Sequence, residues 1–150
     1  MKAVIQRTLK ASVEIGGQMH SQIGKGVLIL LGVESFDNED DVLWLVKKIA
    51  NLRIFNDSNG AMNLSLLDVG GDALVISQFT LFARTKKGNR PSYIDAAPPE
   101  VAIPLYERFI EVFSFELGRK VGTGRFGADM KVELINDGPV TIVIDTKNKI

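Results

Sequence analysis

The segment Val27–Val33 constrains the fold of this chain more than any other part of its sequence. Its residues are apolar on both faces of an extended chain, and branched side chains are frequent among them. Strands buried on both faces are continuous apolar runs, whereas half-exposed strands alternate apolar and polar residues. We therefore expect Val27–Val33 to be a central strand of a β-sheet.

The residues before this segment have strand patterns of a second kind. Val4-Ile5 lies in a short apolar stretch, and the apolar residues of Val13–Ile15 alternate with polar ones, as in a half-buried strand. Gly16-Gly17 can adopt the positive φ angles of a tight hairpin turn. We expect a hairpin here, with His20 in its return strand.

A helix is expected directly after the central strand. Apolar residues between Val42 and Ala50 recur at helical spacing and form one stripe. Asp37 or Asn38 can cap this helix, and the acidic residues Glu39–Asp41 favour its N-terminal end.

A second helix is expected to begin near Ala96–Pro99, because proline is tolerated in a first helical turn. Its apolar residues mostly keep helical spacing as far as Phe113, and Gly118 can end it. Pro104 removes one backbone donor inside this helix, so we expect the helix to start late or to kink there.

The remaining apolar segments predict further strands and complete an order of strands, helix, strands, helix, strands. This order does not alternate as a doubly wound fold does. We predict an α+β fold in one domain, residues 1–150, with mostly antiparallel or mixed sheets forming a barrel-like core and two main helices packed outside. The further strands are expected at Leu52–Phe55, Ala73–Phe82, Met130–Ile135 and Val140–Asp145, the last two joined by a turn at Asn136–Pro139.

Composition excludes several kinds of site. The chain has no cysteine, which excludes disulfides, thiolate metal sites and cysteine nucleophiles. Its one histidine, His20, rules out a multi-histidine metal site within one chain and would have to serve any Ser-His-Asp triad. Beside a hairpin turn, we interpret His20 as a surface residue. We expect no metal and no cofactor.

The apolar runs are also too short for a membrane protein. The longest, Val27–Leu31, cannot span a bilayer, and Met1–Arg7 lacks the apolar core of a signal peptide. A cytoplasmic location without membrane contact is the expectation.

Charge is balanced overall but not locally. The chain has 18 basic and 18 acidic residues, so any affinity for nucleic acid must come from a local patch. Arg84–Arg90 carries four cations with no acid between them. Such a loop is either simply solvated or a phosphate contact, and both interpretations stay open.

Three further segments, rich in glycine or polar residues, do not identify a functional site by themselves. Gly122–Gly127 matches the dinucleotide-binding pattern, but a helix precedes it and a strand follows, the reverse of what that site requires. Ser77–Thr80 interrupts an apolar strand, which indicates either a side-chain hydrogen-bond network or a cleft. Gly138-Pro139, taken alone, is an ordinary turn.

Taken together, these segments resemble the D-aminoacyl-tRNA deacylase family along nearly the whole chain. The two most specific motifs are Ser77–Leu81 and Asn136–Thr141. Pro104 is a local departure that affects only the second helix. The other matching segments are Ala3–Arg7, Asn51–Phe55, Met62–Ser65 and Thr123–Met130.

The resemblance implies a homodimer that cleaves the ester between a D-amino acid and the terminal ribose of tRNA, with active sites at the subunit interface. In such proteins a cis Gly-Pro bond reaches into the partner's pocket and reads chirality. Carried over to this chain, the resemblance implies that one wall of the pocket, with the catalytic residues, is formed by Ser77, Gln78, Phe79 and Thr80. It implies that chirality is read by Gly138 and Pro139. The terminal nucleotide of the 3′ end would lie near Phe126 and Met130.

The residue types suggest how such a site would work. Ester hydrolysis needs donors for the developing oxyanion, and Thr80 as a nucleophile would need a nearby base that the sequence does not supply. Our hypothesis is that backbone donors around Phe79 and Thr80, positioning and the substrate's own 2′-hydroxyl carry the reaction. If Gly138 and Pro139 exclude L-amino acids because the L side chain collides with the wall, glycine, which has no side chain, is not excluded. Glycine mischarged on tRNA is therefore also a predicted substrate.

Two other classes of function remain as alternatives. The first is a non-catalytic RNA-binding dimer that uses the basic loop, and it predicts salt-sensitive RNA binding without ester cleavage. The second is a purely structural dimer in which Ser77–Thr80 forms an interface network.

Overall fold

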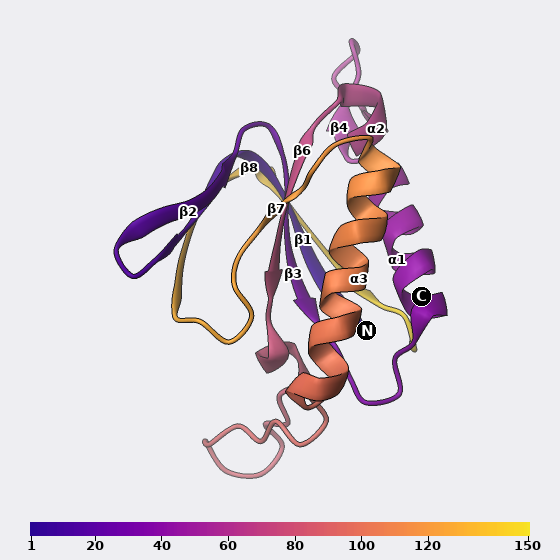
Figure 1. Ribbon diagram of the computed structural model, residues 1–150. Coiled ribbons are helices and arrows are strands. Elements are labelled where there is room, and N and C mark those ends of the chain that lie inside the picture. Colours follow the sequence, from indigo (N-terminus) through magenta and orange to yellow (C-terminus); the bar gives the residue numbers. More distant parts are fainter.

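A computed structural model describes residues 1–150 and contains one large mixed β-sheet (Figure 1). The sheet order is β2-β1-β3-β6-β7, and β8 pairs with β1. The bounds of these strands are β1 Lys2–Ile15, β2 Gln18–Ile23, β3 Gly26–Gly32, β6 Asp72–Ser77, β7 Gly122–Thr123 and β8 Met130–Asp145. The other elements are α1 Glu39–Asn51, β4 Phe55–Asn56, β5 Met62–Leu64, α2 Leu66–Val69, η1 Phe79–Phe82 (a 3₁₀ helix) and α3 Pro99–Leu117.

Strand β3 is central, as its two apolar faces predict. It lies between β1, with which it pairs antiparallel, and β6, with which it pairs parallel. On one face Val27, Ile29 and Leu31 join the core beneath the helices, while Leu28 joins a second apolar cluster on the other face. A strand covered on both sides has no solvent-facing position for a polar residue.

The two apolar clusters explain the architecture. The larger one lies between the sheet and α1 and α3, which pack side by side on one face of the sheet (Figure 1). The smaller one lies inside the curl of the sheet, where β2 approaches β6 and β7 and nearly closes a barrel. The α+β prediction, with a barrel-like core and two main helices outside it, is confirmed.

Local signals placed the hairpin and the first helix correctly. Gly16 and Gly17 have φ of 60° and 75° and connect β1 to β2. Of the two candidate caps for α1, Asn38 is the N-cap, and its side chain accepts hydrogen bonds from the backbone N–H groups of Asp40 and Asp41. Asp37 instead binds the α-ammonium group of Met1, with an N–O distance of 2.5 Å.

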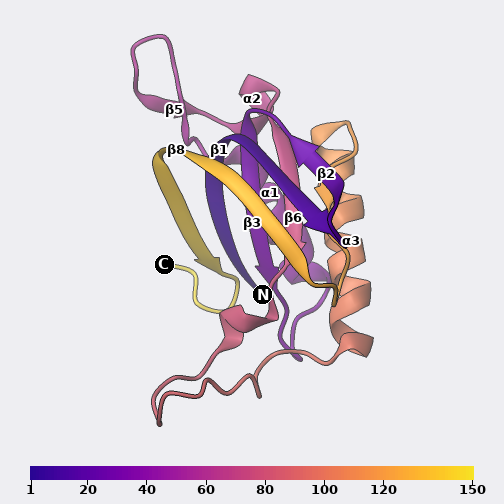
Figure 2. The same cartoon turned by 90° about the vertical axis from the view of Figure 1, so that its left-hand side faces the viewer.

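Three predicted strand boundaries are wrong. The strand expected over Ala73–Phe82 ends at Ser77, because β3, its partner, also ends there, and the chain turns into η1. The strand expected at Leu52–Phe55 is reduced to β4, since Leu52 caps the end of α1. No reversing turn divides Met130–Asp145: both halves pair antiparallel with β1, and β8 bends where the register between the two strands shifts (Figure 2).

Helix α3 does not start late, as one of the two expectations for Pro104 had it. It begins at Pro99, five residues before Pro104, and continues to Leu117. Gly118 ends it in the left-handed conformation, with φ of 70°, as predicted. No helix of the structure is long and apolar enough to cross a bilayer.

Candidate active site

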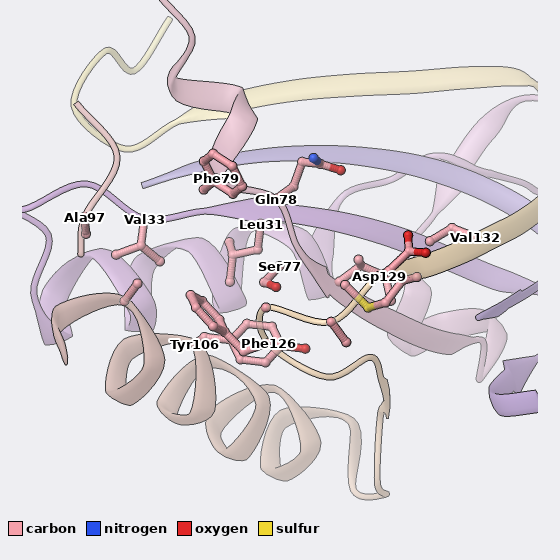
Figure 3. A pocket seen from close by; sticks show the side chains of 15 residues that line it. Leu31, Val33, Ser77, Gln78, Phe79, Ala97, Tyr106, Phe126, Asp129 and Val132 are labelled. Carbon is pink, nitrogen blue, oxygen red and sulfur yellow. The ribbon is translucent and has the colours of Figure 1, made fainter. Parts of the chain in front are cut away.

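A cavity of about 330 Å³ opens between the end of β6, the start of α3 and the segment that leads into β8 (Figure 3). It is called the main cavity below because it brings together predicted site residues from two separate sequence motifs, which lie about fifty positions apart in the chain. Eleven of its fifteen lining residues are hydrophobic. Predicted site residues in its lining are Ser77, Gln78, Phe79, Phe126 and Met130.

The predicted catalytic residues Ser77–Thr80 lie where β6 ends and η1 begins. The backbone N–H of Gln78 donates to the carbonyl of Leu31 at 2.8 Å, and the chain then leaves the sheet as η1. Phe79 and Thr80 are the first residues of this 3₁₀ helix, so their N–H groups have no acceptor within it. No side chain caps these groups. The fold therefore presents two backbone donors beside the cavity.

Thr80 itself does not line the main cavity. Its Oγ1 accepts a hydrogen bond of 2.6 Å from Nε2 of Gln78, which orients both side chains. No carboxylate, amine or imidazole forms a hydrogen bond with this hydroxyl. His20 lies exposed in β2 and lines a different cavity of about 510 Å³. The structure thus supplies Thr80 with no general base.

The opposite wall is aromatic (Figure 3). Tyr106 of α3 lies 6.0 Å from Phe126, measured between ring centroids, and its hydroxyl donates to the carbonyl of Val75 at 2.9 Å. Burial raises the pKa of Tyr106 to about 12, so this residue is a neutral wall at physiological pH. Gly124 allows Met130 to approach this wall, because a Cβ on Gly124 would lie 2.4 Å from the Met130 sulfur.

Gly122 and Gly124 thus have packing roles, whereas Gly127 has positive φ (77°) and faces open space, and the segment does not have the structure of a dinucleotide site. The segment begins with β7, which pairs with β6, and no helix follows it. A phosphate held at a helix N-terminus is therefore not possible there.

The main cavity also contains residues that the sequence analysis did not single out. Tyr106 falls at helical spacing with the buried residues Ala102, Phe109 and Phe113, and this periodicity could have assigned it to the inward face of α3. Asp129 lines the rim and its carboxylate is bound by Lys131 at 3.0 Å. Nothing in its spacing marked it beforehand.

Gly138 and Pro139 lie elsewhere. They are exposed where β8 bends beside Thr8 of β1, whereas η1 follows β6 at the Lys2 end of β1, and neither residue lines the main cavity. The peptide bond between them is cis, and Gly138 has φ of 135°. A Cβ at Gly138 would lie 2.8 Å from Cγ2 of Val140 and 3.1 Å from the guanidinium of Arg7.

Arg7 anchors the backbone of this bend. It is only 7% exposed, and its Nε donates to the carbonyl oxygen of Asp137 at 2.9 Å. Its Nη1 donates to the carbonyl of Ile54 at 2.7 Å, so one side chain ties the bend to the segment before β4. On the other side, the Asn136 side chain accepts from the N–H of Val140 at 3.0 Å. The bend is exposed but held from both sides.

Comparison with known proteins identifies the family. The family described as D-Tyr-tRNA(Tyr) deacylase matches residues 4–145. A protein of Bacteroides thetaiotaomicron named D-aminoacyl-tRNA deacylase is 64% identical over 149 residues, which cover 99% of each chain. One of Flavobacterium psychrophilum with the same name is 62% identical over the same share of both chains. The chain belongs to the D-Tyr-tRNA(Tyr) deacylase family. Family membership confirms the resemblance stated from the sequence and makes the chain a member of a family of hydrolytic enzymes.

Solved structures in this comparison agree with the deacylase fold. One, entitled c-Myc DNA Unwinding Element Binding Protein, superposes with a TM-score of 0.89 at 41% identity and covers 97% of this chain and 98% of its own. Another, entitled a probable eukaryotic D-amino acid tRNA deacylase, has a TM-score of 0.84 at 16% identity, with 95% and 97% covered. The second likeness concerns the fold alone.

Proposed function

We propose that this chain hydrolyses the ester bond of D-aminoacyl-tRNA and releases the free D-amino acid and tRNA. The observation that carries this proposal is that residues of two separate family motifs, Ser77–Phe79 and Phe126–Met130, line one cavity. Its volume of about 330 Å³ is at the lower end of small-ligand pockets, which suits an aminoacyl group with part of a nucleoside. Relatives 62–64% identical over the whole chain carry the name of this activity.

The chemistry rests on main-chain donors. Water attacks the ester carbonyl, and the N–H groups of Phe79 and Thr80 donate to the oxyanion that develops on its oxygen. The bond to the ribose 3′-oxygen then breaks, and this oxygen takes up a proton while the carboxyl product loses one. The neighbouring 2′-hydroxyl of the substrate positions the water and shuttles that proton. The Thr80 hydroxyl cannot replace it, since its hydrogen-bond partner, Gln78, is not a base.

One change in the substrate and one in the protein test this mechanism. A tRNA ending in 2′-deoxyadenosine with a 3′-linked D-tyrosine should bind but remain uncleaved in a single-turnover assay. Thr80→Ala should keep kcat within about tenfold of wild type, because only the hydrogen bond to Gln78 is lost. Rapid cleavage of the deoxy substrate, or loss of turnover in Thr80→Ala with unchanged substrate binding, would contradict it.

Chirality would be read by main-chain atoms as well. In this proposal Gly138 and Pro139 of one subunit enter the cavity of its twin, and their carbonyl oxygens hold the substrate's α-ammonium. With that group and the ester fixed, an L side chain collides with the wall and a D side chain points outward. Glycine has no Cβ to collide, so glycyl-tRNA is the expected second substrate.

A homodimer follows from this arrangement, because Gly138 and Pro139 do not line the cavity of their own chain. We also propose a cytoplasmic site of action, since charged tRNA is consumed there, and no cofactor.

Release of labelled amino acid from charged tRNA tests the whole proposal. D-Tyrosine and glycine should be released, and L-tyrosyl-tRNA should persist under the same conditions. Binding of these RNAs without any release would support a non-catalytic RNA-binding dimer instead, and refusal of glycine would contradict the collision model of chirality.

A further inference from the structure

Residues Arg84–Ile94, here called the arm, are attached at both ends to the mouth of the main cavity. The arm follows η1, whose first residue, Phe79, lines the cavity. It leads to Ala97 and to Ala102 of α3, which line the same cavity. Figures 1 and 2 show the arm projecting from this end of the molecule as an open loop.

The base of the arm is fixed by hydrogen bonds. Arg84 and Ser92 exchange backbone hydrogen bonds of 2.7 and 3.0 Å, which close the loop between them. The Arg84 guanidinium also donates two hydrogen bonds to the Asp95 carboxylate, at 2.5 and 2.6 Å, and these lower the pKa of that carboxyl. Arg84 is therefore a structural cation, already paired with Asp95 at the base of the arm.

The other three cations of the arm are free. Lys86, Lys87 and Arg90 are exposed, and none of them forms a hydrogen bond or an ion pair within the chain. Because the whole chain has a net charge of zero, these three create a local positive region beside the cavity rather than adding to a general one.

Apolar surface lies next to these cations. The ring of Tyr93 meets that of Phe79 edge to face, with centroids 5.1 Å apart, and the two rings are 38% and 54% exposed. Ile94 beside them is 76% exposed. Cations combined with exposed aromatic rings are the usual surface for single-stranded nucleic acid, since phosphates bind the former and unpaired bases stack on the latter.

We propose that the arm binds the single-stranded 3′ end of tRNA just before the aminoacylated nucleotide. This inference rests on the proposed function, which puts the esterified nucleotide in the main cavity. Bases of the preceding nucleotides pack on Tyr93 and Ile94, and their phosphates contact Lys86, Lys87 and Arg90. The backbone of the loop, residues 85–91, reaches at most about 14 Å from its base, which limits the contact to the few nucleotides adjoining the cavity.

The arm should therefore affect substrate capture and not the chemical step. Three phosphate contacts to a single strand predict a slope of about −2 in the logarithm of affinity against the logarithm of salt concentration. The triple variant Lys86→Ala, Lys87→Ala, Arg90→Ala should raise KM for D-tyrosyl-tRNA roughly 30-fold at low salt and remove most of this slope. Its kcat should stay within about twofold.

A minimal substrate separates capture from catalysis. The ester 3′-O-(D-tyrosyl)adenosine has no preceding nucleotides, so the triple variant and wild type should hydrolyse it equally well. A control variant of the same charge change, Lys10→Ala, Lys47→Ala, Lys48→Ala, removes three exposed cations away from the arm. It should leave both substrates unaffected.

Binding of uncharged tRNA gives a readout that does not depend on activity. The triple variant should weaken the Kd for uncharged tRNA by a factor similar to its change in KM. An unchanged Kd and salt slope, an equal loss with the minimal ester, or a change of oligomeric state by sedimentation would each overturn the inference. If wild-type protein cleaves neither ester, the proposed function fails, whereas the Kd comparison still decides whether the arm binds RNA.

Discussion

The main cavity and the Gly138-Pro139 bend differ in almost every physical respect. The cavity is enclosed by β6, η1, α3 and the start of β8, and its lining is mostly apolar. The bend is exposed, lines no part of that cavity, and consists mainly of backbone. Beside the cavity, the first N–H groups of η1 have no side-chain cap, while the backbone of the bend is anchored through Arg7 and Asn136.

This difference teaches that each region has what the other lacks. Under the proposed function, the N–H groups at the start of η1 stabilise an oxyanion beside the cavity, whereas the reading of chirality is assigned to the bend. A fixed, exposed bend can serve as a rigid surface but cannot enclose a substrate. Under the proposed function, a complete site needs the cavity of one copy and the bend of another, as a two-fold dimer provides.

Filling the main cavity should have the largest effect. Ala128 is half-buried in its lining, and Ala128→Trp puts an indole where the substrate would lie. We expect the rate of D-tyrosine release to fall at least about 1000-fold, because substrate positioning and oxyanion stabilisation are both lost. Ala61→Trp, at an exposed turn position, is the control and should keep full activity. Activity in Ala128→Trp would show that the substrate binds elsewhere.

Displacing the bend should have the next largest effect. Gly138→Ala places a Cβ against Val140 and Arg7 at positive φ, so the segment must shift. We expect a loss of roughly 100-fold in kcat/KM, since a shift of about 1 Å is enough to cost that much. Gly17→Ala also puts alanine at positive φ, 75°, but in open space. This control should lose some stability from the positive φ alone, less than Gly138→Ala, and no activity.

Removing the anchor of the bend should affect stability as well as activity. Arg7→Met leaves the carbonyl groups of Asp137 and Ile54 without their donor. We expect the free energy of unfolding to fall by about 2–4 kcal/mol and kcat/KM to fall roughly tenfold. Urea denaturation and the release assay, performed on Arg7→Met and Arg7→Lys, measure both. An Arg7→Met protein with full activity would separate the anchor from the reaction.

The smallest effect is expected in the cavity wall, and it concerns pH. The pKa of Tyr106 is raised by burial from its ordinary value to about 12. An acid whose folded-state pKa is raised stabilises the fold below the unfolded pKa, and this contribution is lost as pH rises through the folded value. Wild type should therefore lose stability relative to Tyr106→Phe between pH 10 and 12, by about 1.4 kcal/mol per pH unit. A constant difference in unfolding free energy across this range would contradict the burial of the hydroxyl.

The sequence predicted those parts of the fold in which one local signal dominates. Three such features are observed as expected: the central strand β3, apolar on both faces, the hairpin turn at Gly16-Gly17, and the helix end at Gly118. Boundaries set by partners were missed. β6 ends at Ser77 because β3 ends, and β8 remains one strand across Gly138-Pro139 because β1 is long enough to pair with both halves.

The candidate site followed the same rule. Ser77–Phe79, Phe126 and Met130 were predicted from motifs and lie together in the cavity lining, whereas Thr80 lies outside it and holds Gln78. The aromatic wall from Tyr106 and the anchor from Arg7 depend on contacts between distant segments. Short-range patterns cannot specify such contacts.

Mixing two inactive variants tests the central claim most directly. Ala128→Trp has a blocked cavity and an intact bend, and Gly138→Ala has the reverse. After the two are unfolded and refolded together in equal amounts, half of the dimers are mixed, and each mixed dimer has one complete site. We predict that D-tyrosine release recovers to about a quarter of the wild-type rate. If mixed dimers are shown to form and the mixture is still as inactive as each variant alone, then each subunit builds its site by itself, and the proposed shared site is wrong.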